Sequence, residues 1–142
     1  MFAQRPVPPL GISPEKVCYI IVKAREFAAK DIVTEPDPGS NPSDDLMISV
    51  LEDHRNDPTV QELQTAIDDL SEDEQIDLVA LMWLGRGDGA IQDWAQIRSD
   101  ASDAHNERTA AYLMGTPLLA DYLEEGLSQF GKSCEDFEIG RL

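Results

Sequence analysis

The chain has 142 residues, of which 42% are hydrophobic, enough for a single domain whose core needs neither metals nor disulfides. Its 28 acidic residues against 11 basic ones give a formal net charge of -17. This charge repels phosphate backbones and anionic lipid, so it excludes nucleic-acid binding through a basic face. It would attract a basic protein partner or divalent cations, or it serves only solubility.

The predicted elements begin with an extended, proline-containing arm. Ser13 can cap the first helix and Pro14 suits its first position, and Asp57-Pro58 has the form of a later helix start. The segment between these starts is rich in proline and aspartate, which predicts a loop. The expected division of the chain is an arm over 1–12, a helix over 13–30, a loop over 31–45, a core domain over 46–131 and an acidic tail over 132–142.

The core domain is predicted to be all-α. Ser71 and Glu74 have the spacing of a capping box. Between Ile76 and Leu84 only Asp77 is polar, so the helix that follows the capping box should be buried nearly all round at the centre of the bundle. No alternating β pattern competes, which predicts a single-domain bundle of about five or six helices.

A long helix with an alanine-rich inward face is predicted over residues 90–114. Gly115 would end it, Thr116 would cap the last helix and Pro117 would open that helix, with Leu118 among its inward residues.

The segment LGRGDGAIQDW, residues 84–94, resembles a calcium loop and contains Arg-Gly-Asp. Among the positions at which such a loop needs side-chain oxygens, only Asp88 supplies one, so an EF-hand is rejected, and a cytoplasmic chain meets no adhesion receptor. We interpret the segment as a helix corner in which Gly85 or Gly87 is left-handed, with Arg86 and Asp88 favourable for the adjoining helix ends.

Helices that run antiparallel on either side of a turn bring together residues equidistant from it. Around the corner at Gly87, Arg98 should therefore approach Asp77 and compensate its buried charge. The same reasoning around Gly115 gives as expected neighbours Arg108 with Glu124 or Glu125, and His105 with Gly126.

Metal-binding and catalytic patterns are sparse. The acids between Asp68 and Asp77 could attract a basic partner or a cation, but we favour their ordinary role at helix N-termini. His54 and His105 lack the spacing of metal ligands and no cofactor motif occurs, so neither catalytic residues nor cofactors are predicted. The alternative is a divalent-metal site formed by carboxylates of the long helix, namely Asp100, Asp103 and Glu107.

The two cysteines, Cys18 and Cys134, are far apart in sequence and form no Cys-x-x-Cys motif. We expect Cys18 to be a small buried hydrophobic residue and Cys134 to be an exposed thiol. The N-terminal residues lack the apolar region of a secretory signal, and no stretch is long and apolar enough to span a membrane. The sequence thus predicts a cytoplasmic protein that does not bind membranes.

Two blocks carry a family resemblance, ALMWLGRGD at 80–88 and ERTAAYLMGTPLLADYLEEGL at 107–127. They resemble a family of small bacterial proteins known as domain of unknown function 3775 (DUF3775), over roughly residues 63–130. The resemblance implies a bacterial, all-helical domain and supplies no activity or cofactor. The candidate binding residues to which the blocks draw attention are Trp83, Arg86, Asp88, Arg108, Tyr112, Thr116 and Tyr122, together with Glu124 as an expected partner of Arg108.

An unbroken helix over residues 90–114 would be about 36 Å long at 1.5 Å per residue, so the loops at its two ends could not meet in one small pocket. This favours fold maintenance or two separate surfaces over a single active site. We therefore predict a non-enzymatic interaction or regulatory protein with an acidic surface, which binds a protein partner of basic character and can form homo-oligomers. The alternatives are a small enzyme or metal-binding protein that uses Asp100, Asp103, Glu107 and His105 or Arg108, and a structural subunit whose partner covers the alanine-rich face.

Overall fold

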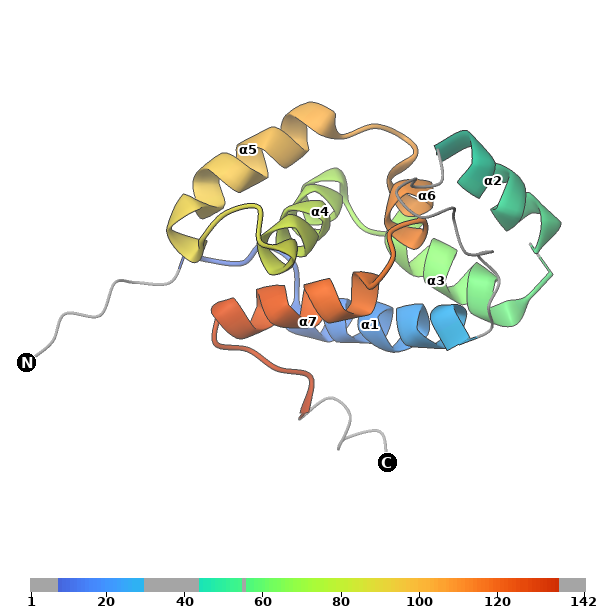
Figure 1. Cartoon of the computed structure of the whole chain (residues 1–142), viewed down its shortest axis with the longest axis horizontal. Coiled ribbons are helices and arrows are strands. Elements are labelled where there is room, and N and C mark those ends of the chain that lie inside the picture. The colour runs from blue at the N-terminus through green and yellow to red at the C-terminus, as the bar shows by residue number, and fades with distance from the viewer. Residues whose placement is uncertain (1–7, 30–43, 55, 136–142) are drawn as a thin grey trace, which may run out of the picture.

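The computed structural model describes residues 8–29, 44–54 and 56–135, and all the regular structure in these ranges is helical, as predicted (Figure 1). The expected loop over 31–45 and parts of the arm and acidic tail lie outside the described residues. No helix among the described residues is long and apolar enough to cross a membrane. The helices are α1 (Pro14–Ala29), α2 (Asp44–Asp53), α3 (Pro58–Asp68), α4 (Glu72–Arg86), α5 (Trp94–Ala104), α6 (Thr109–Met114) and α7 (Leu119–Gln129), with a 3-10 turn η1 (Ile91–Asp93) before α5.

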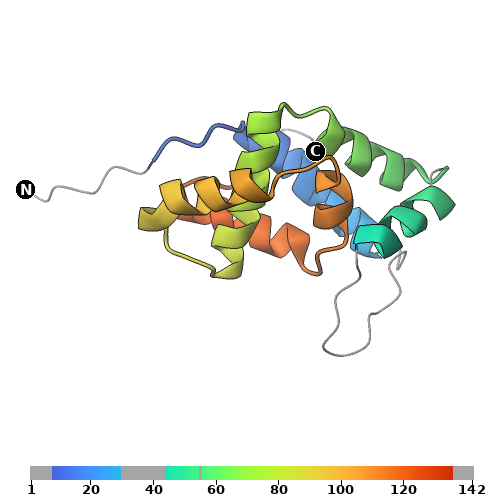
Figure 2. The same ribbon diagram turned by 90° about the horizontal axis from the view of Figure 1, so that it is seen from above.

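Helix α4 is the central helix, because its buried residues include almost every position from Ile76 to Leu84. It lies between α5 on one side and the pair α1 and α7 on the other, and it crosses α7 (Figure 1, Figure 2). Helix α1 packs on α3 and α7, and α2 packs on α6. The prediction of a nearly fully buried helix at the centre of the bundle is confirmed.

Two glycines let the backbones of α4 and α7 approach closely. A Cβ atom at Gly85 would lie 1.7 Å from the carbonyl oxygen of Tyr122, and one at Gly126 would lie 2.5 Å from that of Leu81. No side chain fits in this contact, so the two helices touch backbone to backbone. The contact fixes Tyr122 of α7 against the last turn of α4.

Predicted helix ends are confirmed where local hydrogen bonds define them. Asp57 caps α3 by accepting from the backbone N–H of Thr59 at 2.8 Å. Ser71 and Glu74 form the capping box of α4. Of the two glycines considered for the corner, Gly87 takes the left-handed conformation, with φ 98°.

The prediction of one helix over residues 90–114 is wrong, because the chain leaves the helix after Ala104. The side-chain oxygen of Asn106 accepts from the backbone N–H of Arg108 at 2.7 Å, and the Thr109 hydroxyl donates to the Asn106 carbonyl at 2.9 Å. An asparagine that binds nearby backbone groups in this way competes with helical hydrogen bonds. The chain therefore bends at residues 105–108 and starts α6 in a new direction (Figure 1).

The start predicted for the last helix is also wrong. Gly115 is not left-handed (φ -83°), and the Thr116 hydroxyl donates to the Tyr112 carbonyl at 2.9 Å, so Thr116 satisfies the end of α6 instead of capping α7. The left-handed residue is Leu118, with φ 61°, and α7 begins only at Leu119.

The expectation of two free thiols is wrong. Cys18 of α1 and Cys134, which follows α7, form a disulfide with a Cα–Cα distance of 5.5 Å, and both are buried. After Gly131, which also has a positive φ, the chain places Cys134 against α1. The bond ties residues 131–135 to the first half of α1, and the argument from free cysteines for a cytoplasmic location no longer holds.

Candidate binding site

The α1–α7 pocket is a cavity of about 280 Å³ between α1, α3 and the segment that joins α6 to α7. From α1 it receives Ala24, Arg25, Phe27 and Ala28, and from α3 it receives Leu63. Residues 114–121, the centre of the second sequence block, form the rest of its wall. Helices α1 and α7 lie side by side (Figure 1), and the short turn between α6 and α7 contributes to the lining of the pocket.

Leu118 stands at the pocket with 62% of its surface exposed, and it is the large hydrophobic residue that the described part of the chain leaves exposed. Its left-handed backbone costs a leucine about 1–2 kcal/mol. Single exposed leucines are common on protein surfaces, so the positive φ is the feature that distinguishes this residue. The predicted inward position of Leu118 is therefore wrong. Strained residues of this kind concentrate at functional sites.

The size and lining of the pocket suit an apolar side chain. Sites for drug-sized molecules typically have volumes of about 300–1,000 Å³, so 280 Å³ lies just below that range. Most of the lining is apolar. Arg25 lies at the edge and faces Glu124 at 3.0 Å and Asp121 at 3.6 Å. Glu124, more than Asp121, raises the pKa of Arg25, while burial opposes the rise.

The bend after α5 brings the two sequence blocks together at the corner after α4. Trp83 Nε1 donates to the Tyr112 hydroxyl at 2.8 Å, and this hydroxyl is close enough to Arg86 to contribute to its raised pKa. Arg86 donates to Asp88 through Nε at 3.1 Å and through Nη2 at 2.5 Å. The unbroken helix on which the separation of the two loops depended does not exist, and Trp83 of the first block contacts Tyr112 of the second.

The contacts at this corner connect α4 with α6. The carboxylate of Asp88, and to a smaller extent the Tyr112 hydroxyl, raises the pKa of Arg86 against the effect of burial. Arg86 thus binds Asp88, and Trp83 binds Tyr112. Trp83 and Tyr112 are also half-buried against the core. The contacts explain these residues of the blocks by the fold alone.

The remaining candidate residues lie elsewhere. Tyr122 is half-buried beside Gly85, and Glu124 binds Arg25 of α1 at 3.0 Å. The predicted pairing of Arg108 with Glu124 or Glu125 is wrong, since no ion pair joins these three described residues. Arg108 lies at the bend that starts α6, and the changed direction of the chain removes the symmetry on which the pairing depended.

The three carboxylates proposed as an alternative metal site do not lie together on one helix. Because α5 ends at Ala104, Asp103 and Glu107 do not share one helix, and Asp100 accepts from Gln96 at 2.9 Å. Within the described ranges, no three His, Cys, Asp or Glu side chains are close enough together to hold a metal ion.

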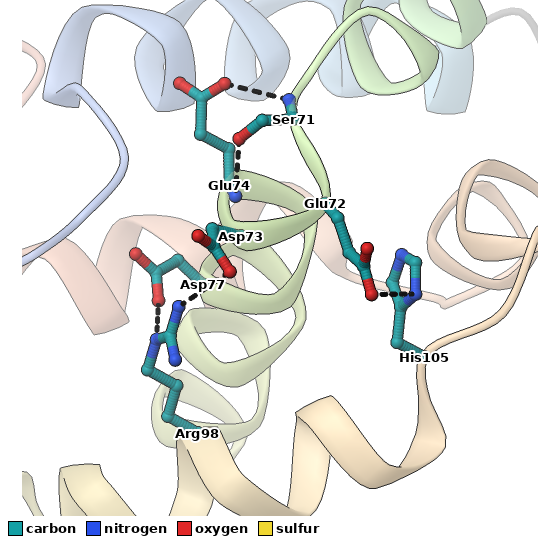
Figure 3. A network of polar contacts seen from close by, with 7 residues as sticks. All are labelled: Ser71, Glu72, Asp73, Glu74, Asp77, Arg98 and His105. Atoms are coloured by element: carbon teal, nitrogen blue, oxygen red, sulfur yellow. Dashed lines mark hydrogen bonds and ion pairs between the residues drawn. The ribbon is translucent and has the colours of Figure 1, made fainter.

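A polar network links α5 and the following bend to the first turns of α4 (Figure 3). Arg98 Nε donates to the buried carboxylate of Asp77 at 2.5 Å, which confirms that predicted contact, and Arg98 also lies 3.7 Å from Asp73. His105 does not lie near Gly126 as expected. Its ring bonds to Gln75 at 2.8 Å and lies 3.7 Å from Glu72. Three of the acids before Asp77 thus have partners inside the fold, namely Glu72, Asp73 and Glu74.

Sequence reasoning missed the residues that form the α1–α7 pocket. Arg25 and Phe27 lie in α1, outside the two blocks, and helical periodicity placed Leu118 with the inward residues of α7. The only available signal was Gly-Thr-Pro, which marks a turn before α7 but does not give the backbone conformation of the residue that follows it.

A family model described as "Protein of unknown function (DUF3775)" matches residues 60–132. Neither a curated protein nor a solved structure matches the chain. The matched region contains Leu63 and all of residues 114–121, whereas the α1 side of the pocket precedes it.

Proposed function

This chain belongs to the DUF3775 family of proteins of unknown function, and we propose that it is a protein-binding module that holds an apolar side chain of its partner in the α1–α7 pocket. Leu118 is the observation that carries the proposal. It is exposed, it has a backbone conformation that leucine disfavours, and it borders an apolar cavity. A partner that covers Leu118 would bury its side chain and fill the cavity in one step.

A photo-crosslinking amino acid at Asp121, at the edge of the pocket, tests this function in cells. We expect an adduct with a partner protein that disappears when Leu118→Asn is added, because asparagine accepts the left-handed backbone and removes only the apolar side chain. The crosslinker at exposed Gln92 on η1 serves as the control position. Adducts that are the same at both positions, or that persist with Leu118→Asn, would contradict the proposal.

The bacterial origin, cytoplasmic location and self-association expected from the sequence stay predictions. The disulfide bears on location, because such bonds persist mainly in oxidising compartments. Fractionating the cells and then alkylating the free thiols of each fraction under denaturing conditions, which expose both buried cysteines, tests the location. Alkylated Cys18 and Cys134 in the soluble cytoplasmic fraction would support it, and an intact disulfide in another fraction would oppose it.

A further inference from the structure

A second depression lies along the exposed face of α7 beside the α1–α7 pocket, and Asp121 lines both. This second depression, the α7 groove, has a volume of about 590 Å³. Glu124, Glu125 and Ser128 of α7 form one wall, and residues 132–135 form the other. The Cys18–Cys134 disulfide holds that second wall against α1. A partner segment seated in the pocket therefore meets the α7 groove next.

Carboxylates outnumber cations in the α7 groove. Asp121, Glu124, Glu125 and Glu135 line it or face it, against Lys132 and, from α1, Arg25. Asp121 is 63% exposed and Glu124 is 50% exposed, so both can bind a further cation while Arg25 is in place. The groove thus favours a cationic side chain beside the apolar one.

We propose that the partner is a basic protein segment with an apolar side chain in the α1–α7 pocket and an adjacent lysine or arginine in the α7 groove. The inference rests on the proposed function and adds the charge of the partner. The net charge of -17 acts in the same direction, because it attracts a basic chain and increases its association rate.

A second copy of this chain is the poorer occupant of the same surface. Two copies each carry -17, so they repel, and the acidic groove of one copy would face a molecule with more than twice as many acids as bases. A partner of opposite charge avoids this repulsion.

Calorimetric titration with designed peptides tests the inference on the full chain. The probe is an amidated peptide of about 12 residues in which pairs of leucine and lysine alternate, a pattern that makes an amphipathic helix. One comparison peptide replaces each lysine with glutamate, and another replaces each leucine with alanine. We expect the leucine–lysine peptide to bind, the leucine–glutamate peptide not to bind, and the alanine–lysine peptide to bind about tenfold more weakly.

Protein variants separate the groove from general attraction to an acidic protein. Glu124→Gln/Glu125→Gln should weaken binding of the leucine–lysine peptide about fivefold, in line with the small energies of exposed charge pairs. Asp100→Asn/Asp103→Asn removes the same charge from α5 and should leave binding nearly unchanged. Equal weakening by the two double variants would show attraction to net charge alone and would overturn the inference.

The remaining outcomes distinguish this inference from the proposed function. Equal binding of the lysine and glutamate peptides, both lost in Leu118→Asn, would overturn the basic partner and leave the pocket's function standing. Binding of the lysine peptide that Leu118→Asn does not change would overturn the role of the pocket itself. No binding by any peptide at about 1 mM would overturn the inference, since even weak specific contacts are seen at that concentration.

Discussion

A substitution at the single residue Leu118 should abolish binding without lowering the stability of the fold. Replacing it with asparagine removes the cost of a left-handed leucine and loses only the partial burial of a residue that is 62% exposed. We expect Leu118→Asn to leave the free energy of unfolding unchanged or to raise it by about 1 kcal/mol. Urea unfolding followed by circular dichroism measures this change.

The matched control is the next residue, Leu119, which is 5% exposed and has ordinary helical surroundings. Leu119→Asn places a polar group in the core and should cost about 2–4 kcal/mol. If Leu118→Asn were as destabilising as Leu119→Asn, Leu118 would be a core residue and the argument from its exposure would be wrong.

Glu74 gives the fold a defined pH dependence. Lys16, at 2.7 Å, and the backbone N–H of Ser71 lower the pKa of Glu74 below its ordinary 4.5. A carboxylate with a lowered pKa in the folded state stabilises the fold above the unfolded-state pKa, and the stabilisation is lost as pH falls through the folded-state pKa. We expect Glu74→Gln to cost about 1 kcal/mol at neutral pH and almost nothing at the acidic end of the titration.

Unfolding free energies of the wild type and Glu74→Gln, measured from pH 7 down to below 4.5, test this dependence. Glu107→Gln at an exposed residue is the control and should follow the wild type. A constant difference between Glu74→Gln and the wild type across the whole range would show that the charge of Glu74 contributes nothing.

Residue-level contacts could be predicted where the rule is local. The capping box of Ser71 and Glu74 depends on spacing alone, and the pairing of Asp77 with Arg98 follows from a buried charge near a tight corner. Leu118 could not be predicted, because its apolar side chain fits the helical pattern and the backbone around it decides its exposure. The pocket depends on that backbone conformation.

At the scale of elements, the contact between α4 and α7 depends on the absence of a side chain at Gly85. Gly85→Ala would place Cβ 1.7 Å from the Tyr122 carbonyl oxygen, so the two helices would have to separate. We expect a loss of about 3 kcal/mol or more, the upper end for overpacked cores. Thermal unfolding of the variant measures it.

Gly89→Ala is the matched control, since its nearest neighbour is the flexible end of the Ile97 side chain, at 2.9 Å from the new Cβ. That side chain can move, so the loss should stay below about 1 kcal/mol. Similar losses in the two variants would mean that α4 and α7 tolerate a wider separation than the structure implies.

Helix identity was predictable from the sequence, whereas helix continuity was not. Residues 105–108 contain neither glycine nor proline, and an inward alanine returns at Ala111, so periodicity predicts one helix. The side chain of Asn106 binds the backbone in the bent chain and would face solvent in a continuous helix. The bend is favoured when the packing of α6 on α2 and α3 stabilises the fold more than the extra hydrogen bonds of one long helix would. That balance is tertiary, and it decides that the Trp83 and Tyr112 blocks meet.

At the scale of the whole molecule, charge and cysteine pairing differ in how far the sequence determines them. The net charge of -17 follows from counting, and its consequence for a basic partner needs no structure. The pairing of Cys18 with Cys134 spans 116 residues and follows from the way α7 returns along α1. Sequence spacing contains no information on that return, so a disulfide could not be distinguished from two free thiols.

The disulfide should stabilise the whole fold and also position the proposed binding surface. Because the bond closes a loop with a sequence separation of 116 residues, its loss increases the entropy of the unfolded chain greatly. We expect reduction to lower the free energy of unfolding by about 2–5 kcal/mol. Urea unfolding with and without reductant measures the loss.

Cys18→Ala/Cys134→Ala is the control for this experiment, since reductant should not change its unfolding. An equal effect of reductant on this variant, or two free thiols in the unreduced denatured protein, would refute the assignment. Because Cys134 lines the α7 groove while α1 lines the pocket, the same bond aligns both parts of the proposed surface. Reduction should therefore weaken binding of the leucine–lysine peptide even while the reduced protein remains folded. Calorimetric titration under such conditions measures the change.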